Sequence, residues 1–101
     1  MPAKLARPYR DGMTVFLVFR HLPGVTRDQY SAVQRAVADV IGSAGGQAAA
    51  RYLGGFFLPA NAQAICVFEA SSAADVQAVN EQANVPFTTV VAALDLRVSG
   101  P

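Results

Sequence analysis

The sequence predicts one α+β domain in which four strands and two helices follow one another in the order βαββαβ. A length of 101 residues corresponds to a single domain. Segments whose apolar side chains alternate with period two are interleaved with segments whose apolar side chains recur every three or four residues. Glycine, proline and asparagine separate these segments. We therefore expect the domain to cover residues 13–101, preceded by a flexible lead-in over residues 1–12.

The first predicted strand covers residues 14–20, and the first helix begins after Thr26. The strand has apolar side chains on both faces, which is typical of a central strand that is covered on both sides. Thr26 and Gln29 have the spacing of a capping box, so the helix should start there. Its apolar stripe comprises Tyr30, Val33, Val37, Val40, Ile41 and Ala44. The helix is expected to end at three glycines, Gly42, Gly45 and Gly46.

Residues 48–58 and 63–70 predict the second and third strands, joined by a turn at residues 59–61. Gly54 and Gly55 lie inside the second strand, residues 48–58. Paired glycines at such a place indicate a β-bulge, or a backbone that another group approaches closely.

A second helix and a last strand complete the pattern. Ser72 and Asp75 repeat the capping spacing. Asn84 can adopt a left-handed conformation and Pro86 cannot continue a helix, so the helix should end before them. The last strand is expected over residues 88–97. This order gives a ferredoxin-like sandwich, with the first and third strands at the centre of the sheet and both helices on one face.

The low charge content predicts that this domain associates with itself. Charged residues make up 15% of the chain, against about 25% in an average soluble domain, and apolar residues make up 52%. The face of the sheet without helices would be an apolar surface. We expect it to meet a second copy of the chain, giving a homodimer in the form of a dimeric α+β barrel.

Several classes of partner and compartment are disfavoured by composition. The net charge is +1 and the basic residues are scattered, so a nucleic-acid partner is not expected. No apolar run approaches the roughly 20 residues that span a bilayer, and no membrane partner is expected. A single cysteine, Cys66, favours a reducing compartment, and we expect the cytoplasm. Sequence motifs of dinucleotide sites, phosphate loops and nucleophile elbows are lacking.

Four segments of the chain, in order, are similar to those of one protein family. They lie at residues 16–26, 52–56, 65–70 and 80–91. Together they resemble a family of small bacterial proteins that is known mostly as a domain of unknown function and that includes a dimeric nickel-binding protein with a ferredoxin-like fold. The resemblance implies a homodimer with a barrel across its interface, and it suggests nickel as a ligand. Many members carry a histidine in the segment that matches residues 78–83, where this chain has Asn80.

Three residues are candidates for metal binding or acid–base chemistry. His21, the only histidine, follows a central strand and can offer one imidazole per chain to nickel, or it can simply be a surface residue. Glu69 is charged on an otherwise apolar strand face, so it lies either at an exposed strand end or inside the barrel as an acid or base. Cys66 has the opposite parity to Glu69 and should lie on the other face, as a small core residue.

Four aromatic residues are the predicted lining of an apolar ligand pocket: Phe16, Tyr52, Phe56 and Phe68. Three functions follow as hypotheses. The first is a dimeric protein that binds a small molecule or a metal such as nickel. The second is a cofactor-free oxygenase, isomerase or cyclase that acts on an apolar or aromatic substrate and uses Glu69 or His21 as a base. The third is a non-catalytic dimeric scaffold. Arg20 can hold a ligand carboxylate or pair with Asp95, and an ion pair at the interface is the role we expect.

Overall fold

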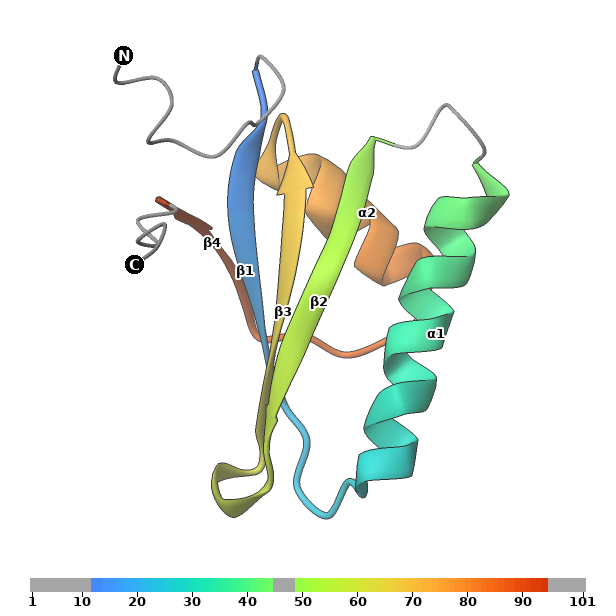
Figure 1. The fold of residues 1–101 in the computed structure, drawn as a ribbon, viewed down its shortest axis with the longest axis vertical. Coiled ribbons are helices and arrows are strands. Elements are labelled where there is room, and N and C mark those ends of the chain that lie inside the picture. Colours follow the sequence, from blue (N-terminus) through green and yellow to red (C-terminus); the bar gives the residue numbers. More distant parts are fainter. Residues whose placement is uncertain (1–11, 45–48, 95–101) are drawn as a thin grey trace, which may run out of the picture.

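The computed structural model describes residues 12–44 and 49–94, and it confirms the predicted order of elements. There are four strands and two helices in the described residues, and their arrangement is shown in Figure 1; a short 3-10 turn, η3, joins two of the strands. The elements are β1 (Thr14–His21), α1 (Arg27–Ser43), β2 (Ala50–Leu58), η3 (Pro59–Asn61), β3 (Gln63–Ala70), α2 (Ala73–Gln82) and β4 (Thr89–Ala93). The fold is therefore ferredoxin-like. Of the predicted lead-in, only Gly12 belongs to the described residues.

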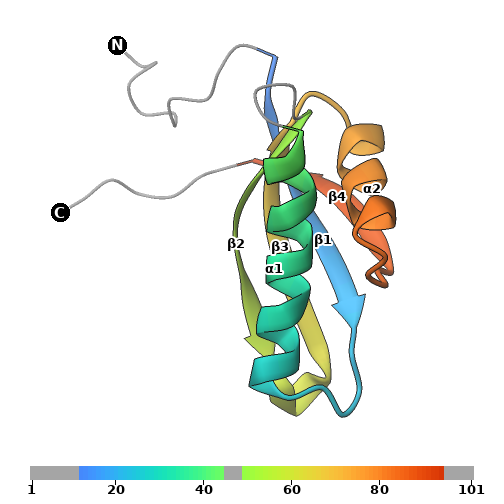
Figure 2. The same ribbon diagram turned by 90° about the vertical axis from the view of Figure 1, so that its right-hand side faces the viewer.

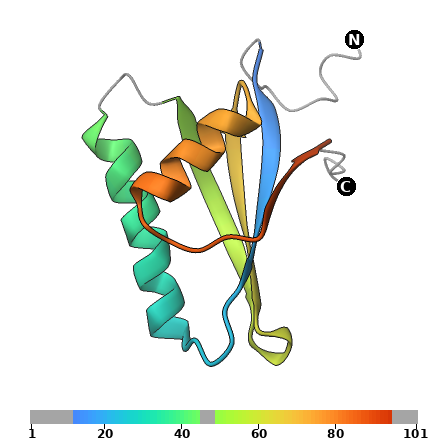
Figure 3. The same ribbon diagram turned by 180° about the vertical axis from the view of Figure 1, so that it is seen from behind.

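The four strands form one antiparallel sheet in the order β2-β3-β1-β4. The prediction that the first and third strands are central is confirmed. Both helices pack on the same face of the sheet, as Figures 2 and 3 show from the side and from behind. We call the face away from the helices the open face.

The hydrophobic core lies between the sheet and the two helices. Alternate side chains of β1 and β3 point into the core, and α1 and α2 cover it on the side away from the sheet. Its most deeply buried apolar members are Val18, Val37, Ala64, Cys66, Phe68, Ala70 and Val76. Burying one large apolar side chain of this kind stabilises the fold by about 1.5–3 kcal/mol.

The start of each helix matches its sequence signal. In the capping box of α1, the Gln29 amide N donates to Thr26 Oγ1 at 3.1 Å, and the Thr26 amide N donates to Gln29 Oε1 at 2.9 Å. At α2, the Asp75 amide N donates to Ser72 Oγ at 3.2 Å. The Asp75 carboxylate accepts a hydrogen bond from the Ser71 hydroxyl, at 3.0 Å.

The ends of the helices follow the prediction only in part. α1 continues through Gly42 to Ser43, and its C-cap is Ala44 in a right-handed conformation. Gly42 therefore does not end the helix, and Gly45 and Gly46 lie outside the described residues. After α2, Asn84 has a φ of 58°, the left-handed conformation expected of it.

β4 is shorter than its prediction. It begins at Thr89 and ends at Ala93, whereas the sequence pattern suggests residues 88–97. The last three residues of that range lie outside the described part of the chain.

The paired glycines of β2 mark a β-bulge. Tyr52 pairs with Phe68, and the next paired residue is Gly54, opposite Val67, so Leu53 is the extra residue. Gly54 has a φ of +132°, which only glycine adopts without strain. Because the bulge adds one residue, side chains after it lie on the opposite face to that expected from simple alternation.

Candidate functional site

The open face of the sheet is an apolar surface. The strand register places Leu17 and Phe19 of β1 beside Ile65 and Val67 of β3 on this face. Phe56 of β2 lies next to Ile65, and Val91 of β4 lies next to Leu17. Phe56 is 65% exposed and Val91 is 44% exposed. No described helix covers this surface (Figures 1 and 2).

One end of the open face carries an ion pair. Glu69 of β3 pairs in register with Arg51 of β2, and Arg51 Nη1 donates to Glu69 Oε1 at 3.0 Å. Glu69 is only 3% exposed, whereas the Arg51 side chain is 57% exposed. A buried carboxylate therefore lies on the side of the open face, so Glu69 is not at an exposed strand end.

His21 lies at the other end of the same face. It is exposed and pairs in register with Gln63, whereas Glu69 pairs with Val15. Six residues separate these two pairs along the strands, which corresponds to about 20 Å. Within one chain, the structure does not bring His21 and Glu69 together.

Cys66 lies on the helix-covered face, opposite to Glu69 as predicted. Its side chain is fully buried beside two phenols. Tyr30 Oη is 3.4 Å from Cys66 Sγ, and Tyr52 Oη donates to the same sulfur at 3.9 Å. Gln34 Nε2 donates to Tyr52 Oη at 2.6 Å. Burial raises the pKa of Tyr30, with a further contribution from Cys66, and burial also raises the pKa of Tyr52, so both phenols stay protonated.

The four aromatic residues predicted to line one pocket lie on two faces. Phe16, Tyr52 and Phe68 are on the helix-covered face, where Tyr52 packs on Phe68 with ring centres 5.2 Å apart. Phe56 points to the open face. The bulge at Leu53 causes this difference, because without it Tyr52 and Phe56 would share a face.

A buried polar pair under α2 was not foreseen from the sequence. Arg20 is 1% exposed and Asn80 is fully buried. Arg20 Nη2 donates to Asn80 Oδ1 at 2.5 Å, and Nη1 donates to the Pro86 carbonyl at 3.0 Å. Asn80 Nδ2 donates to the Val76 carbonyl at 2.8 Å. Among the described residues, both contacts of the guanidinium are to neutral oxygens, and Arg20 Nε has no hydrogen-bond partner.

This position corrects the expectation that Arg20 forms an interface ion pair. Arg20 points under the helices and not to the open face, and Asp95 lies outside the described residues. The sequence holds one signal for this burial, because Arg20 has the same strand parity as Phe16 and Val18.

The donors available in the described residues do not form a nickel site within one chain. Nickel takes imidazole, thiolate or carboxylate groups in sets of four to six. In the described ranges, no three His, Cys, Asp or Glu side chains lie close enough together to hold a metal ion. His21, Cys66 and Glu69 lie at three separate places, and Cys66 is on the other face of the sheet.

Comparison with known proteins identifies the family. Residues 16–92 match the family described as nickel responsive protein SCO4226-like. The chain belongs to the SCO4226-like family. This confirms the resemblance inferred from the four sequence segments. A search of curated proteins gave no match.

A solved structure of the family has the same fold. The crystal structure of SCO4226 from Streptomyces coelicolor A3(2) is similar with a TM-score of 0.66, over 75% of this chain and 90% of that chain. The sequence identity is 23%, so the similarity establishes the fold alone. Among the described residues, neither helix is long and apolar enough to cross a membrane.

Proposed function

We propose that this chain is a small ligand-binding protein that acts as a homodimer, in which the open faces of two sheets pack against each other. The observation that carries the proposal is the apolar open face, with Phe56 projecting from it at 65% exposure. Soluble monomers rarely leave such a continuous apolar surface in contact with water. A second copy of the same surface is the simplest cover, because it is self-complementary about a two-fold axis.

Space for a ligand would arise between the two sheets. Packed sheets lie about 10 Å apart when large side chains fill the layer between them. Gly54 contributes no side chain to the open face, next to Val67. A small organic molecule with an apolar body would suit a cavity lined by Leu17, Val67 and their counterparts in the second copy.

Dimerisation is tested by placing a charge on the open face. We expect the wild-type chain to be a dimer at micromolar concentration and Phe56→Glu to weaken association by at least about tenfold, because like charges would be buried against each other. Phe56 is mostly exposed, so the monomer should stay folded. Light scattering coupled to size-exclusion chromatography measures the mass of each variant.

Ala38→Glu is the matched control, because Ala38 is exposed on α1, away from the open face. It should leave the dimer intact. A wild-type chain that remains monomeric up to millimolar concentration, or a Phe56→Glu variant that remains fully dimeric, would contradict the proposal.

Nickel is a second candidate ligand, favoured by the name of the family. Because the described residues of one chain do not provide a donor set, a nickel site built from them would need donors from two chains. His21 is the exposed imidazole available for this purpose. The family name and this histidine are the support for nickel, whereas the apolar open face supports an organic ligand.

A thermal melt of the metal-stripped protein separates these two ligands. If nickel binds through His21, nickel should raise the melting temperature by several degrees, because a ligand that binds only the folded state stabilises it. Zinc and copper are tested in parallel, and His21→Ala should remove the response. No rise with any metal, or a rise that His21→Ala retains, would count against nickel bound by His21.

An enzymatic role would depend on Glu69. It is the one carboxylate that the described residues place on the side of the open face, and it is 3% exposed, so a substrate could reach it only if the groups around it moved. Its carboxylate oxygen Oε1 is held by Arg51 at 3.0 Å. Within one chain His21 lies at the far end of β1 and cannot act together with Glu69, and for this reason we place binding before catalysis.

A further inference from the structure

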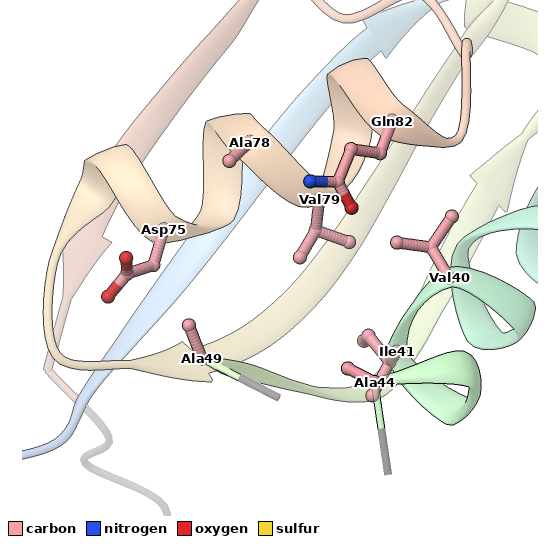
Figure 4. A pocket seen from close by; sticks show the side chains of 8 residues that line it. All are labelled: Val40, Ile41, Ala44, Ala49, Asp75, Ala78, Val79 and Gln82. Carbon is pink, nitrogen blue, oxygen red and sulfur yellow. The ribbon is translucent and has the colours of Figure 1, made fainter. Parts of the chain in front are cut away.

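A groove between α1 and α2 lies on the helical side of the molecule, away from the open face. Its volume is about 200 Å³. Figure 4 shows its walls, which come from Val40, Ile41 and Ala44 at the end of α1 and from Asp75, Val79 and Gln82 of α2. This volume corresponds to six or seven water molecules, at about 30 Å³ each. It is too small for a nucleotide or a large cofactor, but it can hold a small organic molecule.

The groove combines apolar walls with a single charge. Asp75 is its only charged lining residue, and the amide of Gln82 is the other polar side chain. Ser71 Oγ donates to Asp75 Oδ2 at 3.0 Å, and the Asp75 backbone amide is fixed on Ser72 Oγ. One carboxylate oxygen is thus engaged by Ser71, and the other, Oδ1, receives no hydrogen bond from the described residues.

We propose that this groove binds a small primary amine with a branched apolar body. The ammonium group donates to Asp75 Oδ1, and the apolar body packs against Val79 and Ile41. A charge-assisted hydrogen bond of this kind is shorter and stronger than one between neutral groups. An acid of the same shape is repelled by Asp75, and an alcohol lacks the charge. The site is independent of the proposed dimer, because it lies on the opposite side of the sheet.

Three probes of the same shape test the charge preference: isopentylamine, isopentanol and isovalerate. Each is titrated into isotopically labelled protein at constant pH, and the backbone amide signals are followed by nuclear magnetic resonance. We expect isopentylamine to shift the signals of residues 40–44 and 75–82 with a several-fold lower dissociation constant than isopentanol. Isovalerate should leave these signals unchanged. Equal responses to all three probes, or shifts confined to the open face, would overturn the proposal.

Two matched variants test the role of Asp75. Asp75→Asn removes the charge and should make isopentylamine bind no better than isopentanol. Asp28→Asn changes the acidic residue in the first turn of α1, outside the groove, and should leave the amine preference unchanged. Retention of the preference in Asp75→Asn would refute the proposal. Should Asp75→Asn fail to fold, Ala78→Leu keeps the carboxylate and fills the groove, and it should abolish binding of the amine and the alcohol alike.

Discussion

Asn80→Leu should lower the free energy of unfolding by about 3 kcal/mol. Asn80 is fully buried and supplies one of the two oxygen acceptors of the Arg20 guanidinium. Leucine has a similar size, so little cavity forms. The loss comes from a hydrogen bond to a charged group, about 1.5–3 kcal/mol, and from a buried cation that keeps only the Pro86 carbonyl. Urea denaturation at neutral pH measures it.

Two further variants separate this electrostatic cause from simple packing. Asn80→Asp keeps an acceptor for Arg20 and adds a counter-charge, so its stability should lie within about 1 kcal/mol of wild type. The double variant Arg20→Met with Asn80→Leu removes both polar partners and should recover most of the loss. If Asn80→Leu costs less than 1 kcal/mol, or if the double variant is no more stable than Asn80→Leu, the guanidinium does not depend on Asn80.

The fold could be predicted from the sequence because its signals are local. The limits of β3 coincide with the predicted 63–70, because turn residues flank a short alternating segment on both sides. The start of α1 could be placed because a capping box requires only Thr26 and Gln29. The end of α1 could not, because the glycine at position 42 is tolerated inside the helix, where a single glycine costs only about 1 kcal/mol.

The arrangement of the candidate site could be predicted only in part, because it depends on one extra residue. Gly54 and Gly55 indicated a bulge, but the residue that would be left unpaired is fixed by the pairing with β3. Leu53 is that residue, and it moves Phe56 to the open face while Tyr52 stays under α1. A pocket shared by these two rings therefore cannot form within one chain.

The burial of Arg20 depends on contacts between distant segments. Its partners, Asn80 and Pro86, are 60 and 66 residues away in the sequence. Strand parity could place Arg20 on the core face, but it could not show which oxygens would accept hydrogen bonds from its guanidinium. The same contacts fix α2 and the segment before β4 to the end of β1. The position of the helix that carries Asp75 and Gln82 therefore depends on a pair that lies outside the groove.

Gly55→Ala should destabilise the fold by about 2–3 kcal/mol, the second large effect that we expect. A Cβ atom at position 55 would overlap the Tyr30 hydroxyl and would lie 2.8 Å from the carbonyl oxygen of Ile65. Tyr30 cannot move aside without loss, because it contacts Cys66 Sγ and stacks on Phe57 with ring centres 5.2 Å apart. The Ile65 carbonyl belongs to the backbone of β3. Overpacking in a well-ordered core costs about 1–3 kcal/mol, and here both the Tyr30 hydroxyl and the Ile65 carbonyl would have to shift to admit the new methyl group.

Gly42→Ala is the natural control, because a Cβ at this position in α1 meets no atom within 4 Å. It should stabilise the protein by up to about 1 kcal/mol, since alanine is the better helix former. In a Tyr30→Phe background the closest contact is gone, and the Ile65 carbonyl at 2.8 Å and the Tyr52 hydroxyl at 3.2 Å remain next to the new methyl group, so Gly55→Ala should cost less there than in wild type. An unchanged cost in that background would mean that the Ile65 carbonyl and the Tyr52 hydroxyl, and not the Tyr30 hydroxyl, set the requirement for glycine. A cost below 1 kcal/mol in wild type would show that α1 can move away from the sheet, and the close packing of the two phenols around the thiol would then be adaptable.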